Sequence, residues 1–414
     1  MTLKTSLNDN TRILGLKPNV FLLGLVSLLT DISSEMIFTL VPIFLANVLG
    51  TSTALIGFIG GFSDSSEAFF KIFSGYLSDR RQKHKSFTFL GYAFSAIARP
   101  LMYFASSWGM VAGVRFFDRL GKGVRTAPRD ALLAGSMEPH ERGRGFGLHK
   151  AMDSLGACIG LGVAAIIIYQ TQGGSLVLGL ETYQRLVLVG ILPGILALLL
   201  FFLVKESKSK FEAPVAAGTN SPSRVSRWNL GTRFNLFLVV VAIFTLGNSS
   251  DFFIILRAQN VGVPLIQITL MLVLFNIVYS LVAWPAGRLS DRLGRRKMIT
   301  AGWSIYALVY FGLAIANSPG QIWVLFVFYG VYYGIVQGVT RAFVADLIPA
   351  ERRGTAYGLF HGTIGLTLLP ASLIAGWLWD AVNPASTFFF GAALALVAVI
   401  LLRILVKEPA PEST

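Results

Sequence analysis

Gly75-Tyr76-Leu77-Ser78-Asp79-Arg80 is repeated as Gly287-Arg288-Leu289-Ser290-Asp291-Arg292, and each copy runs into a basic segment. The two aspartates are 212 residues apart (291 − 79), which is about half of the 414-residue chain. A hydrophilic string that recurs at half length is hard to obtain by chance. The repeat therefore predicts that the chain consists of two homologous halves, and it marks the same point in each.

The composition is that of an integral membrane protein. Hydrophobic residues make up 54% of the chain and charged residues 14%, whereas soluble proteins carry about 25% charged residues. The net charge of +14 could suggest a nucleic-acid partner, but most Lys and Arg residues fall in the termini and in alternate loops. The loops between them, at 50–53, 106–109 and 317–320, carry no charge. Because this alternation follows the positive-inside rule, it predicts a multi-pass protein of the plasma (inner) membrane with cytoplasmic termini and no nucleic-acid partner.

Twelve stretches are apolar and long enough to cross a lipid bilayer as helices, which takes about 20 residues. They are residues 20–48, 54–77, 87–106, 108–128, 145–169, 185–204, 234–257, 264–286, 298–317, 320–343, 356–379 and 386–406. The sequence therefore predicts an all-α fold of twelve transmembrane helices in two pseudo-symmetric six-helix bundles. In this prediction residues 1–204 form the N-terminal bundle, 205–233 a cytoplasmic linker and 234–414 the C-terminal bundle.

The repeat extends into the apolar stretches. Ser33-Ser34-Glu35 matches Ser249-Ser250-Asp251, and at the 212-residue offset Asp64 corresponds to Asn276 and Arg129 to Arg341. The chain resembles the major facilitator superfamily, whose signature Gly-x-Leu-x-Asp-Arg-x-Gly-Arg-Arg-Lys is matched in full by residues 287–297. The first copy departs from it at Gln82 and His84. The resemblance implies a transporter that works by alternating access between its halves.

The same resemblance implies a cytoplasmic gate at the repeated motif. Its residues would be Gly75, Asp79, Arg80, Gly287, Asp291 and Arg292. A carboxylate at the end of one helix can face the positive N-terminus of another. In the family this contact, together with an Arg across the pseudo-twofold axis, locks the outward-open state.

Acidic residues inside the expected spans predict proton coupling. An ionisable group there costs about 2.5–3.5 kcal/mol on insertion, so it is a functional candidate by default. Asp31 and Glu35 share one face of the first span, Asp64 lies in the second, and Asp251 matches Glu35 in the seventh. An acid in a poorly solvated cavity can take up and release a proton near neutral pH. Glu67 and Lys71, four residues apart, are expected to form a structural ion pair.

Arg115 and Lys150 are the basic residues expected to act inside the spans. Arg115, with Gly121, is similar to a second family motif, although Asp118 replaces its usual Gln, and the resemblance implies that Arg115 communicates with a protonatable acid. In the fifth span Leu161 replaces the proline of the family's antiporter signature. Lys150 either pairs with Asp153 or faces the cavity, where it would bind an anionic group.

The remaining cavity candidates are polar residues of the second half. They are Asn276, Tyr329, Tyr333, Gln337 and His361. The tyrosines either form an amphipathic wall for the substrate or belong to the core. Trp303, near the end of a span, is expected in the interfacial belt.

No catalytic or cofactor motif is visible in the sequence. The single cysteine, Cys158, rules out a disulfide or a cysteine metal cluster, and there is no P-loop, His-Glu-x-x-His or nucleophile elbow. We therefore expect no enzyme activity, no cofactor and no metal. The predicted function is proton-coupled secondary transport of a small organic solute by a monomer, with efflux of an amphiphilic or cationic compound favoured. The alternatives are an organic anion, such as a metabolite or siderophore bound by Arg115 and Lys150, and a membrane sensor that moves no solute.

Overall fold

The chain is all-helical in the part that the structure describes. The structure is a computed structural model, and it describes Arg12 and residues 17–81, 83–137, 141–206, 230–348 and 353–406. Of residues 79, 142, 143 and 353–355 it describes the backbone alone. No strand occurs in these ranges. Most of the predicted linker, residues 207–229, lies outside them, so the predicted domain boundaries stay a prediction.

The helices form two sets of six spans. The first half holds α1 (Pro18–Phe38), α2 (Val41–Asn47), α3 (Thr53–Arg81), α4 (His84–Leu101), η1 (Met102–Phe104), α5 (Trp108–Gly135), α6 (Arg142–Gln172) and α7 (Leu180–Phe201). The second half holds α8 (Thr232–Gly247), α9 (Phe252–Asn260), α10 (Leu265–Leu293), α11 (Arg295–Ile315), α12 (Pro319–Leu347), α13 (Arg353–Ala381) and α14 (Pro384–Leu405). The predicted twelve-span, all-α fold is thereby confirmed.

The first span of each half is a broken helix. Residues 39–40 separate α1 from α2, and residues 248–251 separate α8 from α9. Within the described ranges, nine spans are apolar enough to be recognised by length and composition alone, counting each broken helix as one. The remaining three, α3, α4 and α5, all belong to the first half. The first half therefore concentrates the polar residues inside the fold.

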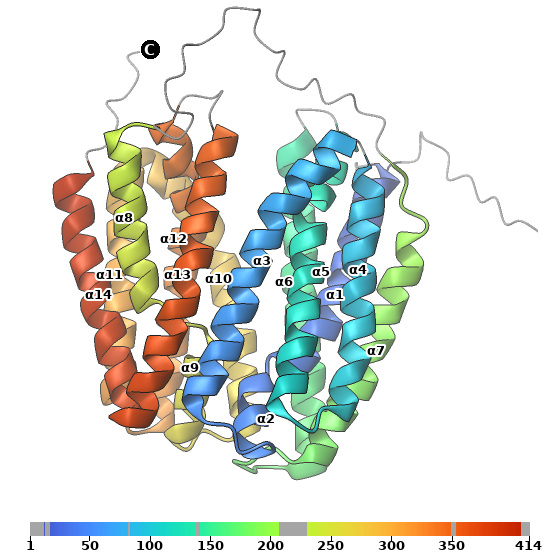
Figure 1. Ribbon diagram of the computed structural model, residues 1–414, viewed down its shortest axis with the longest axis vertical. Helices are drawn as coiled ribbons and strands as arrows, with labels where there is room; N and C mark the ends of the chain where they lie inside the picture. The colour runs from blue at the N-terminus through green and yellow to red at the C-terminus, as the bar shows by residue number, and fades with distance from the viewer. Residues whose placement is uncertain are drawn as a thin grey trace, which may run out of the picture.

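The two halves stand side by side, with α3 and α13 at the centre (Figure 1). We call the end that holds the basic segments 80–85 and 292–297 the basic end, and the end that holds α2 and α9 the distal end. At the basic end Gly294 joins α10 to α11 with φ 95°, a left-handed conformation that favours glycine. This requirement explains the glycine of the second motif copy. Gln82, its counterpart in the first copy, lies outside the described residues.

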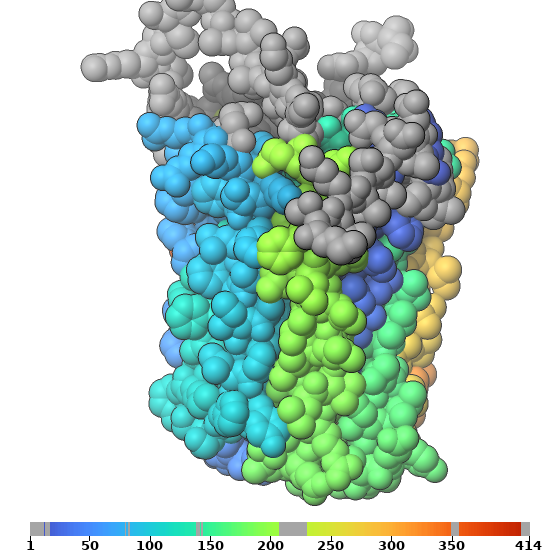
Figure 2. Space-filling model, turned by 90° about the vertical axis from the view of Figure 1, so that its right-hand side faces the viewer, coloured from blue at the N-terminus to red at the C-terminus, as the bar shows by residue number. Residues whose placement is uncertain are grey.

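The outer surface of the first half is apolar. Figure 2 looks onto this half, where α4 and α7 lie side by side. Helix α7 exposes Leu188, Leu192, Leu196 and Leu199, and α4 exposes Ile97. A soluble protein would not leave such a large apolar patch in water. The surface fits a helix bundle surrounded by lipid.

The halves meet at the distal end and separate toward the basic end. The Asp380 carboxylate of α13 accepts hydrogen bonds from the backbone N–H groups of Thr53 and Ala54, at 3.2 and 2.7 Å, at the start of α3. A Cβ on Gly376 would lie only 2.5 Å from Ala54 Cα, whereas one on Gly358 would meet nothing within 4 Å. Helices α3 and α13 accordingly diverge toward the basic end (Figure 1).

Replacing Asp380 by alanine is expected to loosen the distal contact between the halves. The loss of a side chain that caps a helix N-terminus costs about 0.5–2 kcal/mol. Spin labels at Ser106 and Asn317, which are exposed at this end of opposite halves, would then report a larger share of long distances. The matched control is Glu181→Ala, because Glu181 is a distal carboxylate that pairs with Arg185 on its own helix. An unchanged distance distribution in D380A would contradict the role of Asp380.

Candidate functional site

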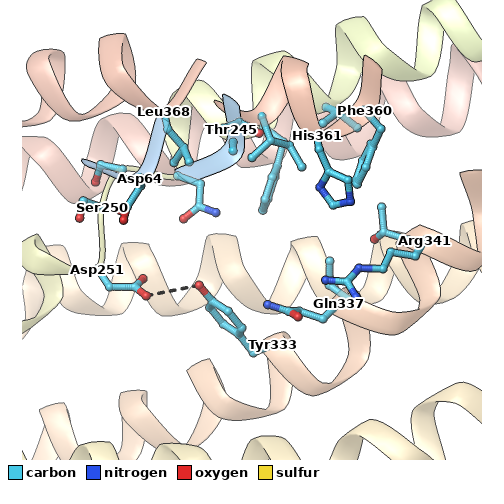
Figure 3. Close-up of a pocket in the computed structure, with 18 of the residues that line it drawn as sticks. Asp64, Thr245, Ser250, Asp251, Tyr333, Gln337, Arg341, Phe360, His361 and Leu368 are labelled. Atoms are coloured by element: carbon cyan, nitrogen blue, oxygen red, sulfur yellow. Dashed lines mark hydrogen bonds between the residues drawn. The ribbon is translucent and has the colours of Figure 1, made fainter. Parts of the chain in front are cut away.

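A cavity of about 440 Å³ lies between the halves. One wall is α3 of the first half, and the other walls are α8, the break before α9, α11, α12 and α13 of the second. Its acidic and basic lining residues, tyrosines aside, are Asp64, Glu67, Lys71, Asp251, Arg341 and His361. Figure 3 shows Asp64 and Asp251 at one end of the cavity and Arg341 and His361 at the other. One side of the cavity is therefore acidic and the other side is basic.

Asp251 lies where the seventh span is interrupted. Asn248, Ser249 and Ser250 precede it, and such residues favour turns and caps over helix interiors. The Asp251 side chain makes no hydrogen bond that caps α9. Its two carboxylate oxygens instead accept hydrogen bonds from the hydroxyls of Tyr329, at 2.6 Å, and Tyr333, at 3.4 Å. Among the described residues no cation lies within ion-pair distance of Asp251, so its carboxylate is held by neutral donors.

The two acids of α3 are paired with helix α5. The Arg119 guanidinium lies 3.6 Å from Asp64 and 2.7 Å from Glu67, and Lys122 lies 3.8 Å from Glu67. The expected ion pair between Glu67 and Lys71 is wrong, because the Glu67 carboxylate is bound by Arg119 and Lys122 of α5 and is not within 4.0 Å of Lys71. The pairing with α5 leaves Lys71 without a carboxylate of its own.

The other two candidate acids lie within the first half and do not line this cavity. Glu35 accepts a hydrogen bond of 2.6 Å from the Thr39 hydroxyl on its own helix. Asp31 is one turn before it on α1, and among the described residues it has no ion pair. The structure thus brings Asp64 and Asp251 together in the cavity and leaves Asp31 and Glu35 outside it.

Arg115 lies at the interface between the two broken helices. It is 1% exposed, and its guanidinium stacks on Phe38 of α1 at 4.9 Å and on Phe252 of α9 at 5.3 Å. No carboxylate among the described residues lies within 4 Å of it. Its contacts with both halves are cation–π contacts, and the acid with which it was expected to communicate is not in contact with it here.

The predicted cavity residues divide into two groups. Tyr333, Gln337 and His361 line the cavity, and Tyr329 supports Asp251. Lys150, Asp153 and Asn276 do not line it. Lys150 lies 5.3 Å from the Tyr279 ring across the α6–α10 contact, and the Asn276 amide bonds the Leu272 carbonyl on its own helix. Neither alternative for Lys150 holds, because it does not line the cavity and Asp153 lies 3.6 Å from His149 instead.

Several cavity residues were not predicted from the sequence. Trp303, expected in the interfacial belt, is 2% exposed, lines the cavity and stacks on Phe244 at 4.3 Å. Lys71 and Arg341 were not assigned to the cavity. In the sequence, Arg341 could have been recognised as a cavity candidate by its place opposite Arg129 in the repeat. Lys71 could have been recognised as a cation inside an apolar span.

The predicted gate lies at the basic end of the molecule. Asp291 is exposed and lies 3.4 Å from Arg295, and Arg295 also binds Asp346 at the end of α12. These contacts stay within the second half. Arg80 and Arg292 are exposed, and the side chain of Asp79 lies outside the described residues. At the glycines, a Cβ on Gly75 would meet Ala127 of its own half at 3.2 Å, and one on Gly287 would meet nothing within 4 Å.

Known proteins resemble the chain over nearly its whole length. A family model described as Major Facilitator Superfamily matches residues 23–257 and 234–414. An uncharacterized MFS-type transporter of Methanocaldococcus jannaschii is 37% identical over 401 residues, which are 95% of this chain and 96% of that protein. The cis,cis-muconate transport protein of Acinetobacter baylyi is 24% identical and covers 94% of both chains. The crystal structure of a D-xylose-proton symporter superposes with a TM-score of 0.75 at 15% identity, covering 94% of this chain and 97% of that one.

Proposed function

The chain belongs to the major facilitator superfamily, and we propose that it couples the movement of a small organic solute to that of a proton. It is a membrane transporter with twelve spans in two halves. In our proposal the cavity between the halves binds the solute and opens alternately to the two sides of the membrane.

Asp251 carries the proposal of proton coupling. Among the described carboxylates that line the cavity, it is the one without a cationic partner, since Asp64 and Glu67 face Arg119. Its partners are tyrosine hydroxyls, which can donate to a carboxylate or accept from a carboxylic acid. Asp251 can therefore gain or lose a proton without leaving an unpaired cation behind.

The positions of the basic residues support an inward-facing state. By the positive-inside rule the basic end would face the cytoplasm, and the termini would lie there too. The halves are in contact at the distal end and diverge toward the basic end. The structure would then represent the carrier with its cavity open to the cytoplasm.

The test is proton movement driven by solute in vesicles that contain the purified protein and a pH-sensitive dye. Cis,cis-muconate is the first probe, because a full-length relative is named for its transport. Ethidium tests the efflux of an amphiphilic cation, and succinate, glucose 6-phosphate and glucose widen the range. We expect at least one probe to change the internal pH in vesicles with the protein and not in empty ones. Solute flux without any proton movement would contradict the coupling, and no flux of any probe would contradict the proposal as a whole.

A further inference from the structure

Three nitrogen-bearing side chains line the basic side of the cavity. Lys71 comes from α3 of the first half, and Arg341 and His361 come from α12 and α13 of the second. The charges of Lys71 and Arg341 repel each other and both act on His361, while the more distant carboxylates of Glu67 and Asp130 partly offset the repulsion at Lys71. Figure 3 shows Arg341 and His361 facing the same part of the cavity, with Gln337 beside them. The cluster is therefore shared between the two halves.

Neither cation has a carboxylate partner. Within the described residues no Asp or Glu oxygen lies within 4.0 Å of Lys71 or Arg341. Several other cations inside the fold do have a carboxylate partner: Arg99 has Asp118, Arg119 has Asp64 and Glu67, Lys122 has Glu67, and Arg129 has Asp130. The buried Arg115 and Arg125 lie on aromatic rings instead and do not line the cavity. Two unpaired cations that face one cavity attract an anion from solution.

We propose that Lys71, Arg341 and His361 form a subsite for the carboxylate or phosphate group of a small organic anion. This inference rests on the proposed transport function, and it names the solute class. The guanidinium fork of Arg341 matches the geometry of both groups, and the Lys71 ammonium adds a point charge. The Gln337 amide lies about one helical turn before Arg341 and offers a further donor.

The rest of the cavity fits the body of such a solute. Aromatic side chains line it, among them Phe244, Trp303 and Phe360. Lys71 follows Asp64 on α3 by seven residues, which is about 10 Å along a helix. An anion bound at Lys71 therefore keeps its charged group away from Asp251 at the other end of the cavity. A volume of about 440 Å³ is in the range of sites for small organic molecules.

The subsite also gives the anion a role in closing the carrier. Lys71 and Arg341 belong to opposite halves, so their repulsion opposes closure of the basic end. An anion between them replaces this repulsion by two attractive contacts. Closure of the loaded carrier is thereby favoured over closure of the empty one.

The test compares anions with neutral molecules of nearly the same shape. Binding to the purified full-length protein is measured by thermal shift with succinate, benzoate and glucose 6-phosphate, and with succinamide, benzamide and glucose as their counterparts. We expect at least one anion to stabilise the protein and its neutral counterpart to have no effect. Lys71→Gln and Arg341→Gln should each weaken that binding about tenfold or more, because each removes a charge-assisted contact, and Lys71→Arg should restore it.

The matched control is Arg403→Gln, which removes an exposed charge near the basic end of α14, away from the cavity. Its affinity for the anion should equal that of the wild type. The subsite is contradicted if no anion of the set binds, if the neutral counterparts bind as tightly, or if K71Q and R341Q keep the wild-type affinity. Anion binding without proton movement in vesicles would contradict the proposed coupling alone. Proton movement driven only by ethidium or glucose would contradict the subsite alone.

Discussion

Replacing Asp251 by asparagine is expected to abolish solute-driven proton movement while leaving a folded protein in the membrane. Asparagine has the size of aspartate, and its amide oxygen can still accept a hydrogen bond from Tyr329, which lies 2.6 Å from the carboxylate. It cannot bind or release a proton. Proton movement in vesicles should therefore fall to that of empty vesicles, whereas the exchange of labelled solute at equal concentrations, which needs no net proton flux, should persist.

Two further variants make the result specific. Glu181→Gln removes a distal carboxylate whose partner is Arg185 on the same helix, and it should leave coupling unchanged. Glu35→Gln tests the other acid that the sequence predicts, which binds Thr39 and does not line the cavity. If coupling is lost in E35Q and kept in D251N, the titrating group lies in the first span and our assignment of Asp251 is wrong.

Replacing Arg99 by methionine is expected to destabilise the whole first half. The side chains of Arg99 and Asp118 are 2% and 5% exposed and lie 3.4 Å apart, and Arg99 also donates to the Thr30 carbonyl. Removal of one partner of a buried ion pair leaves an uncompensated charge and costs about 3–5 kcal/mol. The midpoint of thermal unfolding in detergent should fall clearly, together with the yield of folded protein.

The double variant Arg99→Met with Asp118→Leu separates charge from packing. It removes both charges, so most of the lost stability should return. Arg185→Met is the exposed control, because its pair with Glu181 is at the surface and is worth about 0–1 kcal/mol. The role of the Arg99 charge in stability would be contradicted if the double variant were no more stable than R99M. It would also be contradicted if R99M were as stable as R185M.

The fold could be predicted from the sequence because the patterns that indicate it extend over many residues. Nine of the spans that the structure describes are apolar runs of about 20 residues or more, and the motif repeated at Asp79 and Asp291 reveals the duplication. The breaks at residues 39–40 and 248–251 were not predicted. A break of two to four residues barely changes the hydropathy of a window several times longer, so both spans look continuous in the sequence.

The site follows from the sequence only in part. Acids inside apolar spans stand out, which is how Asp64 and Asp251 could be predicted. Their partners could not, because the rotation of each helix and the crossing of its neighbours decide which side chains meet. Glu67 is thus one turn from Lys71 in the sequence but binds Arg119 of α5 in the fold. Trp303 is buried because α11 lies behind the cavity, and hydropathy does not carry that information.

In our proposal the two halves alternate under the control of a proton on Asp251. Distances between spin labels test it directly in a Cys158→Ser background, with one pair at Lys83 and Lys297 of the basic end and another at Ser106 and Asn317 of the distal end. All four positions are exposed. We predict that a change of pH shifts the two distance distributions in opposite directions, and that D251N removes the shift. Distributions that stay the same at every pH, or that still shift in D251N, would contradict the account.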